Sequence, residues 1–188
     1  RQVFSEQTLK DLDAFAKDMK GNKSLSESLV KYKEGGFGSG FIYVDPKTGN
    51  NYVITNRHVV ELAETLTVNF IDKNTGDFSE KPYEGLKILA VSSDIDIAIL
   101  EFPKGVKPFK TGLQIYTNAL DDGDSVWTAG FPAFEGKPAW QLGTGSITNA
   151  TAKLDSLIKS NISTVIQHNA QIDGGSSGGP LLLKDSSA

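Results

Sequence analysis

The sequence predicts an all-β protein, either a barrel or a sandwich, with one helix before the first strand. Short stretches rich in Val, Ile, Leu and aromatic residues follow one another along most of the chain. Turn signals separate them at residues 47–50, 74–77 and 121–124, where Gly stands beside Asn or Asp. Many short strands at such spacing are typical of antiparallel barrels and sandwiches.

The helix is expected over residues 6–20. Its apolar residues recur at helical spacing, namely Leu9, Leu12, Ala16 and Met19. Ser5 is well suited to cap its beginning, and Gly21 its end. We favour packing of this helix on its own domain. Contact with a second copy of the chain, or connection to a further segment, stays open.

The strands are expected after a polar linker at 21–26. In chain order they are 28–33, 37–44, 52–55, 65–71, 86–92, 97–102, 125–131, 140–148, 164–168 and 180–183. Pro103 and Gly105 end the strand at 97–102. A crossover over about 103–124 then leads into the second half of the chain.

Composition excludes several kinds of protein. The 188 residues suit one domain with a substantial core. A net charge of −4 leaves no basic excess to neutralise phosphates, so nucleic acid is not expected as a partner. No apolar run approaches the roughly 20 residues that a membrane helix needs. The lack of cysteine excludes disulfides and thiolate metal sites, and it suits an exported bacterial protein.

The Gly-rich stretch at 173–180 is the strongest chemical signal. Glycine and proline form tight turns there and permit close backbone approach. Two serines, Ser176 and Ser177, stand in the middle. A serine hydroxyl is a weak nucleophile, so it needs a base, and the base needs an orienting acid.

Few residues can act as that base, because the chain has 2 histidines. His58 follows one apolar strand, and Asp96 stands at the start of another. The chain order His58, Asp96, Ser177 is that of the chymotrypsin-like arrangement among known Ser-His-Asp triads.

The contexts of these three residues resemble the motifs of trypsin-like serine proteases. Residues 55–59, TNRHV, resemble T-x-x-H-[VC]. Residues 96–100, DIAIL, resemble D-[IL]-A-[LI]-L. Residues 175–180, GSSGGP, resemble G-[DN]-S-G-G-P. The combination is specific, although each motif alone is not.

Two further segments resemble the bacterial, cysteine-free HtrA branch of that family. Residues 38–42, GSGFI, resemble G-S-G-[FV]-I, and residues 166–173, IQHNAQID, resemble I-Q-T-D-A-x-I-N. The likeness runs from about residue 28 to residue 183. It implies a serine endopeptidase that acts on unfolded or exposed segments of proteins and peptides. It also implies a bacterial origin and an extracytoplasmic location, periplasmic or secreted.

The same resemblance implies two six-stranded antiparallel β-barrels of the trypsin-like fold, with the site in the cleft between them. The domains are then an N-terminal helix and linker at 1–26 and a protease domain at 27–188. The first barrel covers about 27–105 and the second about 124–188. Few residues follow Ser177 before Ala188, which we interpret as an incomplete second barrel. A truncated chain, a tail missing from this sequence and a genuine fragment all stay open as explanations.

The site residues follow from the motifs. Ser177 is the expected nucleophile, His58 the general base, and Asp96 the residue that orients it. The backbone N–H groups of Gly175 and Ser177 form the expected oxyanion hole. Gln171 lies where the base of the specificity pocket is expected. No cofactor or metal is expected.

Several neighbouring residues compete for these roles. Ser176 is rejected as nucleophile by its register in the motif. His168 is interpreted as structural or as part of the substrate cleft. Asp94 points to the same side of an extended chain as Asp96, and only the Asp-Ile-Ala register favours Asp96. Arg57 is interpreted as a surface charge.

Some signals are weak. The triplets that begin at Asn149 and Asn161 fit glycosylation sites, but such triplets arise easily by chance. The acidic turn at 121–124 lacks the spaced ligands of a calcium loop, so a plain turn is favoured.

The sequence also departs from the family. Ser176 replaces the Asp or Asn that usually precedes the nucleophile, so activation by an acid paired with a new N-terminus is not expected. An inactive, protease-like peptide-binding or chaperone module is therefore the alternative function. An esterase or lipase is a third hypothesis, because 175–179 fits G-x-S-x-G, but such enzymes use another triad order.

Overall fold

The computed structural model describes residues 36–61, 63–72, 74–92, 94–153 and 164–183. It also describes four residues of the expected N-terminal helix, Gln7, Lys10, Asp11 and Ala14, which are helical and exposed. The remainder of that helix, the linker at 21–26 and the expected strand at 28–33 lie outside the described residues.

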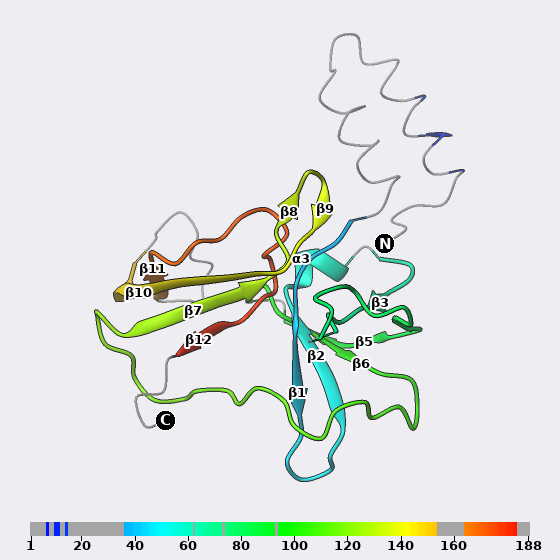
Figure 1. Ribbon diagram of the computed structural model, residues 1–188, viewed down its shortest axis with the longest axis horizontal. Coiled ribbons are helices and arrows are strands. Elements are labelled where there is room, and N and C mark those ends of the chain that lie inside the picture. The colour runs from blue at the N-terminus through cyan, green and yellow to red at the C-terminus, as the bar shows by residue number, and fades with distance from the viewer. Residues whose placement is uncertain are drawn as a thin grey trace.

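The first half of the chain forms a four-stranded antiparallel sheet (Figure 1). Its order is β1 (Phe41–Val44), β2 (Asn51–Thr55), β6 (Ala98–Glu101) and β5 (Lys87–Val91). The inward side chains of the two central strands alternate with more exposed ones, as expected for a sheet with one buried face. Val53, Ala98 and Leu100 lie at the centre of this core.

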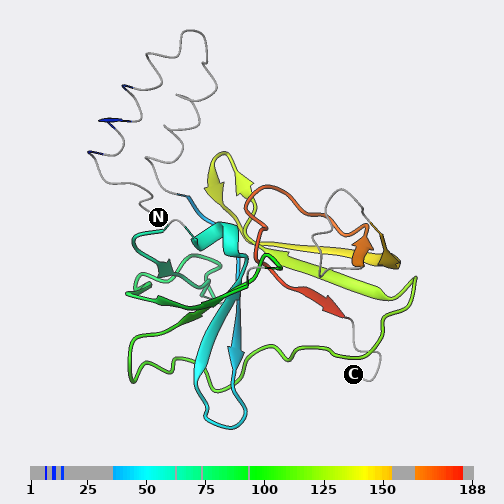
Figure 2. The same cartoon turned by 180° about the vertical axis from the view of Figure 1, so that it is seen from behind.

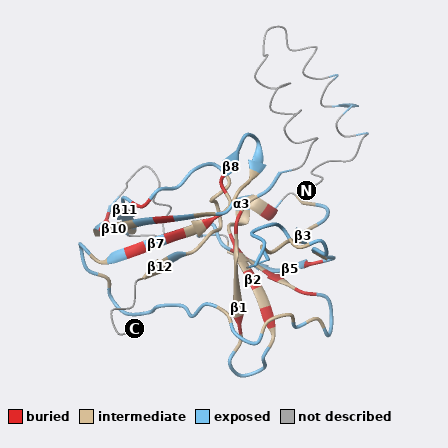
Figure 3. Ribbon diagram, in the orientation of Figure 1, coloured by how far each residue is buried: buried red, intermediate tan, exposed pale blue. Residues whose placement is uncertain are grey.

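A second four-stranded antiparallel sheet follows. Its order is β11 (Val165–His168), β10 (Gln141–Ala152), β7 (Ser125–Gly130) and β12 (Leu181–Leu183). Val126, Ile147 and Ala170 form its core. Figure 3 shows buried residues on β2, β7 and β10, in the middle of the two sheets.

Smaller elements lie between the strands within each half of the chain. They are α3 (Arg57–Val60), the hairpin of β3 (Thr67–Val68) with β4 (Tyr83–Glu84), and the hairpin of β8 (Ala133–Phe134) with β9 (Lys137–Pro138). Figures 1 and 2 show the two sheets side by side, joined by the long segment between β6 and β7. This crossover runs along β1, because Leu113 N–H donates to the Ile42 carbonyl (2.8 Å).

The expected fold class is confirmed in its coarse form, since the described chain is mostly β. The two six-stranded barrels stay a prediction, because the ladders within the described ranges are two open sheets and two hairpins. The strands β4, β8 and β9 were not predicted. Each has only two residues, too few to show an alternation of apolar and polar side chains. In the described part, no helix is long and apolar enough to span a bilayer.

Ile147 supports the second sheet, and its truncation should be costly. The residue is 1% exposed, whereas Ile166 on the neighbouring strand is 43% exposed. We expect Ile147→Ala to lower the free energy of unfolding by about 2–5 kcal/mol, because it removes buried methyl groups and leaves a cavity. The control Ile166→Ala should cost about 1 kcal/mol or less. Urea titrations of both variants measure this, and equal losses would contradict the assigned core.

Candidate active site

His58 and Asp96 meet because two paired strands end side by side. Thr55 on β2 pairs with Ala98 on β6, so the residues after β2 lie beside those before β6. The His58 ring lies with its Nδ1 2.5 Å from Asp96 Oδ2. The His58 backbone N–H donates to the other carboxylate oxygen, Oδ1 (2.8 Å). Both oxygens of Asp96 thus bind the same histidine.

The two residues before His58 hold the turn that carries Asp96. The Asn56 side-chain amide donates to the Asp96 carbonyl (2.6 Å). Arg57 Nη1 donates to the Ser92 carbonyl at the base of that turn (3.2 Å), and its Nε lies 3.1 Å from Glu61 Oε2. Arg57 is therefore a clamp on the Asp96 turn as well as a charge near the surface. Asn56 had no predicted role and Arg57 was interpreted only as a surface charge, although both stand in the TNRH motif.

The electrostatics of the pair favour an ionised carboxylate. Partial burial alone would raise the pKa of Asp96. Hydrogen bonds from the His58 backbone N–H and ring, together with the charges of His58 and Arg57, outweigh burial and lower that pKa below its ordinary value. Asp96 is thus charged near neutral pH and can accept from His58 Nδ1–H.

The serine loop at 173–180 is built from tight turns. Ser176 N–H donates to the Asp173 carbonyl, and Gly179 N–H to the Ser176 carbonyl (2.9 Å each). Gly175 and Gly178 have φ of 103° and 86°, a region that favours glycine. Within the described chain, the N–H groups of Gly175 and Ser177 donate to no protein acceptor. These two groups are available to a ligand.

Ser39 holds this loop against the end of β2, just before α3, which carries His58. Its N–H donates to the Ser177 carbonyl and its hydroxyl to the Gly175 carbonyl (2.7 Å each). The Ser39 carbonyl accepts from the Thr55 hydroxyl, two residues before α3 (2.7 Å). The Ser39 hydroxyl also accepts a hydrogen bond from Phe131 N–H (2.8 Å). Ser39 had no predicted role, although it stands in the GSGFI segment.

Gly38 lies against both the residue after His58 and the carbonyl of Ser177. A Cβ at Gly38 would lie 2.7 Å from Val59 Cγ1 and 3.2 Å from the Ser177 carbonyl. In the described residues, Ser177 Oγ makes no hydrogen bond, with His58 or with any other group. Catalytic hydrogen bonds often tighten only when substrate binds.

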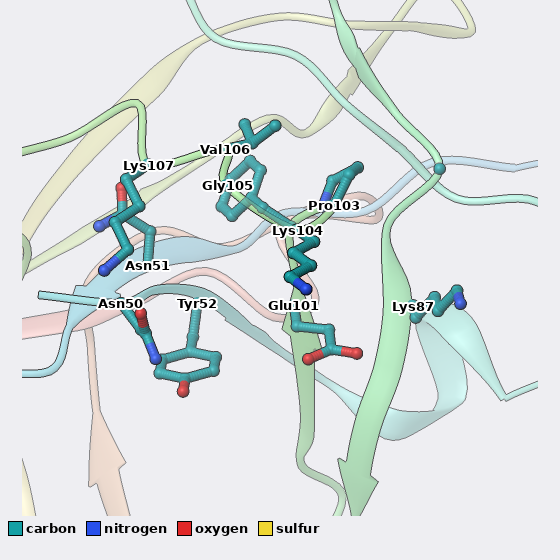
Figure 4. Close-up of a pocket in the computed structure, with 12 residues that line it drawn as sticks. Asn50, Asn51, Tyr52, Lys87, Glu101, Pro103, Lys104, Gly105, Val106 and Lys107 are labelled. Carbon is teal, nitrogen blue, oxygen red and sulfur yellow. The ribbon is translucent and has the colours of Figure 1, made fainter. Parts of the chain in front are cut away.

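A cleft of about 230 Å³ opens beside Ser177. His168 and Gln171 line this cleft together with Ser177. A larger hollow of about 450 Å³ lies at the start of β2 and the end of β6, around Asn51, Glu101 and Lys104 (Figure 4). It includes no candidate catalytic residue. Among the described residues, no cluster of His, Asp or Glu is arranged to hold a metal.

Residues 38–187 match the model of the trypsin-like peptidase domain. The chain belongs to the trypsin-like peptidase family. Among relatives of this trypsin-like chain, Serine protease Do-like HtrA of Bacillus subtilis (strain 168) is 33% identical over 86% of this chain and 34% of its own length. The HtrA of Lactobacillus helveticus is 28% identical over 89% of this chain and 37% of its own length. Protease Do-like 1, chloroplastic, of Arabidopsis thaliana is 33% identical over 78% and 30%.

These relatives confirm the HtrA-like resemblance. The chain spans about a third of the length of each relative. Solved structures support the trypsin-like fold. Deg5 matches with a TM-score of 0.55 and 21% identity, over 96% of this chain and 82% of Deg5. The inactive form of the Rv3671c protease matches with a TM-score of 0.55 and 24% identity, over 77% and 65%.

Gly178 should tolerate no side chain. Its φ is +86°, and a Cβ would collide with Thr55 Oγ1 and Ser39 O and lie 2.9 Å from Asn56 N. Gly49 has φ +66° with open space around it, which makes it a matched control. We expect Gly178→Ala to lower the unfolding free energy by about 2–4 kcal/mol, and Gly49→Ala by about 1 kcal/mol. Chemical denaturation measures both. Similar losses would mean that the loop does not pack on β2 as described.

The Asp96–His58 pair should lose its stabilising effect in acid. The folded-state pKa of Asp96 lies below its ordinary value of 3.8, so the pair contributes fully above that value. The contribution disappears as the pH falls through the lowered pKa. The difference in unfolding free energy between the protein and Asp96→Asn should therefore shrink below about pH 4. Urea titrations across this range measure it, and a difference that grows on acidification would refute the assignment.

Proposed function

We propose that this protein is a serine endopeptidase that hydrolyses peptide bonds through an acyl-enzyme on Ser177. The observation that carries the proposal is the double contact between His58 and Asp96 at the sheet end onto which Ser39 fastens the serine loop. Membership of the trypsin-like peptidase family supports the same reaction class.

In this proposal, Ser177 Oγ attacks the carbonyl carbon of the scissile bond. His58 Nε2 takes the hydroxyl proton as the new C–O bond forms. Asp96 accepts from His58 Nδ1–H, which keeps the Nε2 lone pair available and stabilises the imidazolium that results. His58 then returns the proton to the leaving amine as the C–N bond breaks. Water attacks the resulting ester by the same route in reverse, and Ser177 is regenerated.

The negative oxygen of the tetrahedral intermediate needs hydrogen-bond donors. The N–H groups of Gly175 and Ser177 suit this role because neither has a partner in the described residues. Loss of one such donor typically lowers turnover by about 10²–10³. The φ of 103° at Gly175 suits the role, since glycine adopts such a backbone without strain.

Ser176 does not suit the nucleophile's role. Its hydroxyl accepts from the Asp173 N–H (3.3 Å), which engages it within the loop. Ser176 thus closes the loop locally where related proteases carry Asp or Asn. This contact favours Ser177 as the attacking residue. The serine hydroxyl makes it without an acidic side chain at position 176.

The substrates we propose are proteins and peptides, as the names of the HtrA relatives suggest. The location we propose is extracytoplasmic, which the lack of cysteine suits. Association of copies through the N-terminal helix stays a prediction, because most of that helix lies outside the described residues.

A fluorophosphonate probe tests the nucleophile directly. We expect it to label Ser177, since the probe reports a serine activated by a neighbouring base. Labelling should vanish in Ser177→Ala and fall steeply in His58→Ala. The matched control Ser176→Ala should keep the label. Intact-mass and peptide mass spectrometry measure the adduct, and labelling that survives Ser177→Ala would exclude the proposed nucleophile.

Turnover separates the proposal from its alternatives. Cleavage of casein that falls by about 10⁴–10⁶ in Ser177→Ala supports the endopeptidase. Peptide binding without labelling or cleavage would instead favour an inactive binding module. Hydrolysis of small esters without casein cleavage would favour an esterase.

A further inference from the structure

The cleft beside Ser177 has room for a single side chain. Its volume is about 230 Å³, below the roughly 300–1,000 Å³ of pockets that hold drug-sized ligands. Ser177 and Gln171 both line it, so a group bound there lies next to the proposed nucleophile. If Ser177 attacks a peptide bond, this cleft receives a side chain near that bond.

The wall that carries His168 and Gln171 is held firmly. The Thr128 hydroxyl donates to the Gln171 carbonyl (2.8 Å). Asn169 Oδ1 accepts from Ser146 N–H on β10 (2.8 Å). Gly145 lets the two segments approach, since a Cβ there would lie 2.5 Å from Ala170 N. Polar groups on such a wall are preorganised, so little ordering is needed when a ligand binds.

His168 offers a hydrogen-bond donor to the cleft. Its Nδ1 is enclosed and has no partner in the described part of the chain. Orphaned buried N–H groups are rarer than unpaired acceptors, which assigns the hydrogen of the neutral ring to Nε2. Of the two ring nitrogens of His168, only Nδ1 is both enclosed and unpaired. His168 also lines the cleft. Nε2–H is therefore the group that can donate to a ligand.

Gln171 offers the matching acceptor. Its amide nitrogen donates to Asp173 Oδ2 (3.3 Å), which leaves the amide oxygen to receive a hydrogen bond. Asp173 is the only charged group that lines the cleft in the described structure, and no Lys or Arg does. A substrate carboxylate would meet this negative charge and find no cation.

We propose that the cleft is a specificity subsite for a carboxamide side chain, Gln or Asn, with His168 Nε2–H as donor and Gln171 Oε1 as acceptor. This inference rests on the proposed peptidase function and names its substrate class. The carboxamide oxygen accepts from His168 while its NH₂ donates to Gln171. An apolar side chain leaves both groups unpaired, which disfavours it.

Peptide substrates that differ at one position test the subsite. We use tetrapeptide p-nitroanilides with Gln, Glu, Lys or Leu before the scissile bond and the full chain of the protein. The kcat/KM should be about tenfold higher for Gln than for the other three, the equivalent of one net hydrogen bond. The ratio of Gln to Leu should fall about tenfold in His168→Phe.

Controls keep the outcomes distinct. Gln171→Met should also lower the Gln-to-Leu ratio, which covers the case in which His168→Phe does not fold. The matched control Gln167→Ala changes an exposed residue of β11 outside the cleft and should keep the ratio. Ser177-dependent cleavage that prefers Leu, Lys or Glu would overturn the subsite and leave the peptidase function standing.

If no substrate is cleaved, the proposed peptidase function is wrong. Peptide binding then tests the subsite by itself. Tetrapeptides that end in Gln or Leu are titrated calorimetrically into Ser177→Ala. About tenfold tighter binding of the Gln peptide supports the subsite independently of turnover. Equal affinities would refute it.

Discussion

The junction between the two sheets depends on one buried serine. Ser39 is 5% exposed, and its amide, hydroxyl and carbonyl each bind another segment. Two of these bonds hold carbonyls of the serine loop, and one holds Thr55 at the end of β2. A buried polar group without a partner costs about 1–3 kcal/mol. Because displacement of the loop would unpair several groups at once, the loop and the end of β2 keep a single relative position.

Glycine residues let the segments at this junction approach closely. A Cβ at Gly130 would lie 2.9 Å from the Ser39 hydroxyl, and one at Gly38 would reach Val59 beside His58. The Gly-rich composition of residues 173–180 therefore has two separate causes. Gly175 and Gly178 supply positive φ for the turns, whereas Gly179 permits backbone contact, with φ outside that region. Around Ser39, the close contacts between the serine loop and the end of β2 are thus made largely by main chain and by small side chains.

Local motifs predicted that His58 and Asp96 would lie together, whereas the long-range contacts around them were not predicted. His58 and Asp96 were found because each stands in a short, recognisable context, and strand pairing explains why they meet. Ser39 was missed because its partner Gly175 lies 136 positions away, and nothing near residue 39 names it. The contact of Arg57 with the Ser92 carbonyl was not predicted, since its partner lies 35 positions away in the chain. The closure of barrels depends on strands that pair across the chain, which a local pattern does not determine.

The proposed chemistry and the proposed recognition come from different sheets. The first sheet supplies His58 and Asp96 through the pairing of β2 with β6. The second supplies the cleft wall through β10 and β11. A substitution in that wall leaves the β2–β6 ladder unchanged, so substrate preference can change without altering the charge pair. The serine loop is the shared part, and it joins the sheets through backbone groups that side-chain changes elsewhere do not remove. In the proposed function, this separation lets the same proposed triad serve different peptide sequences.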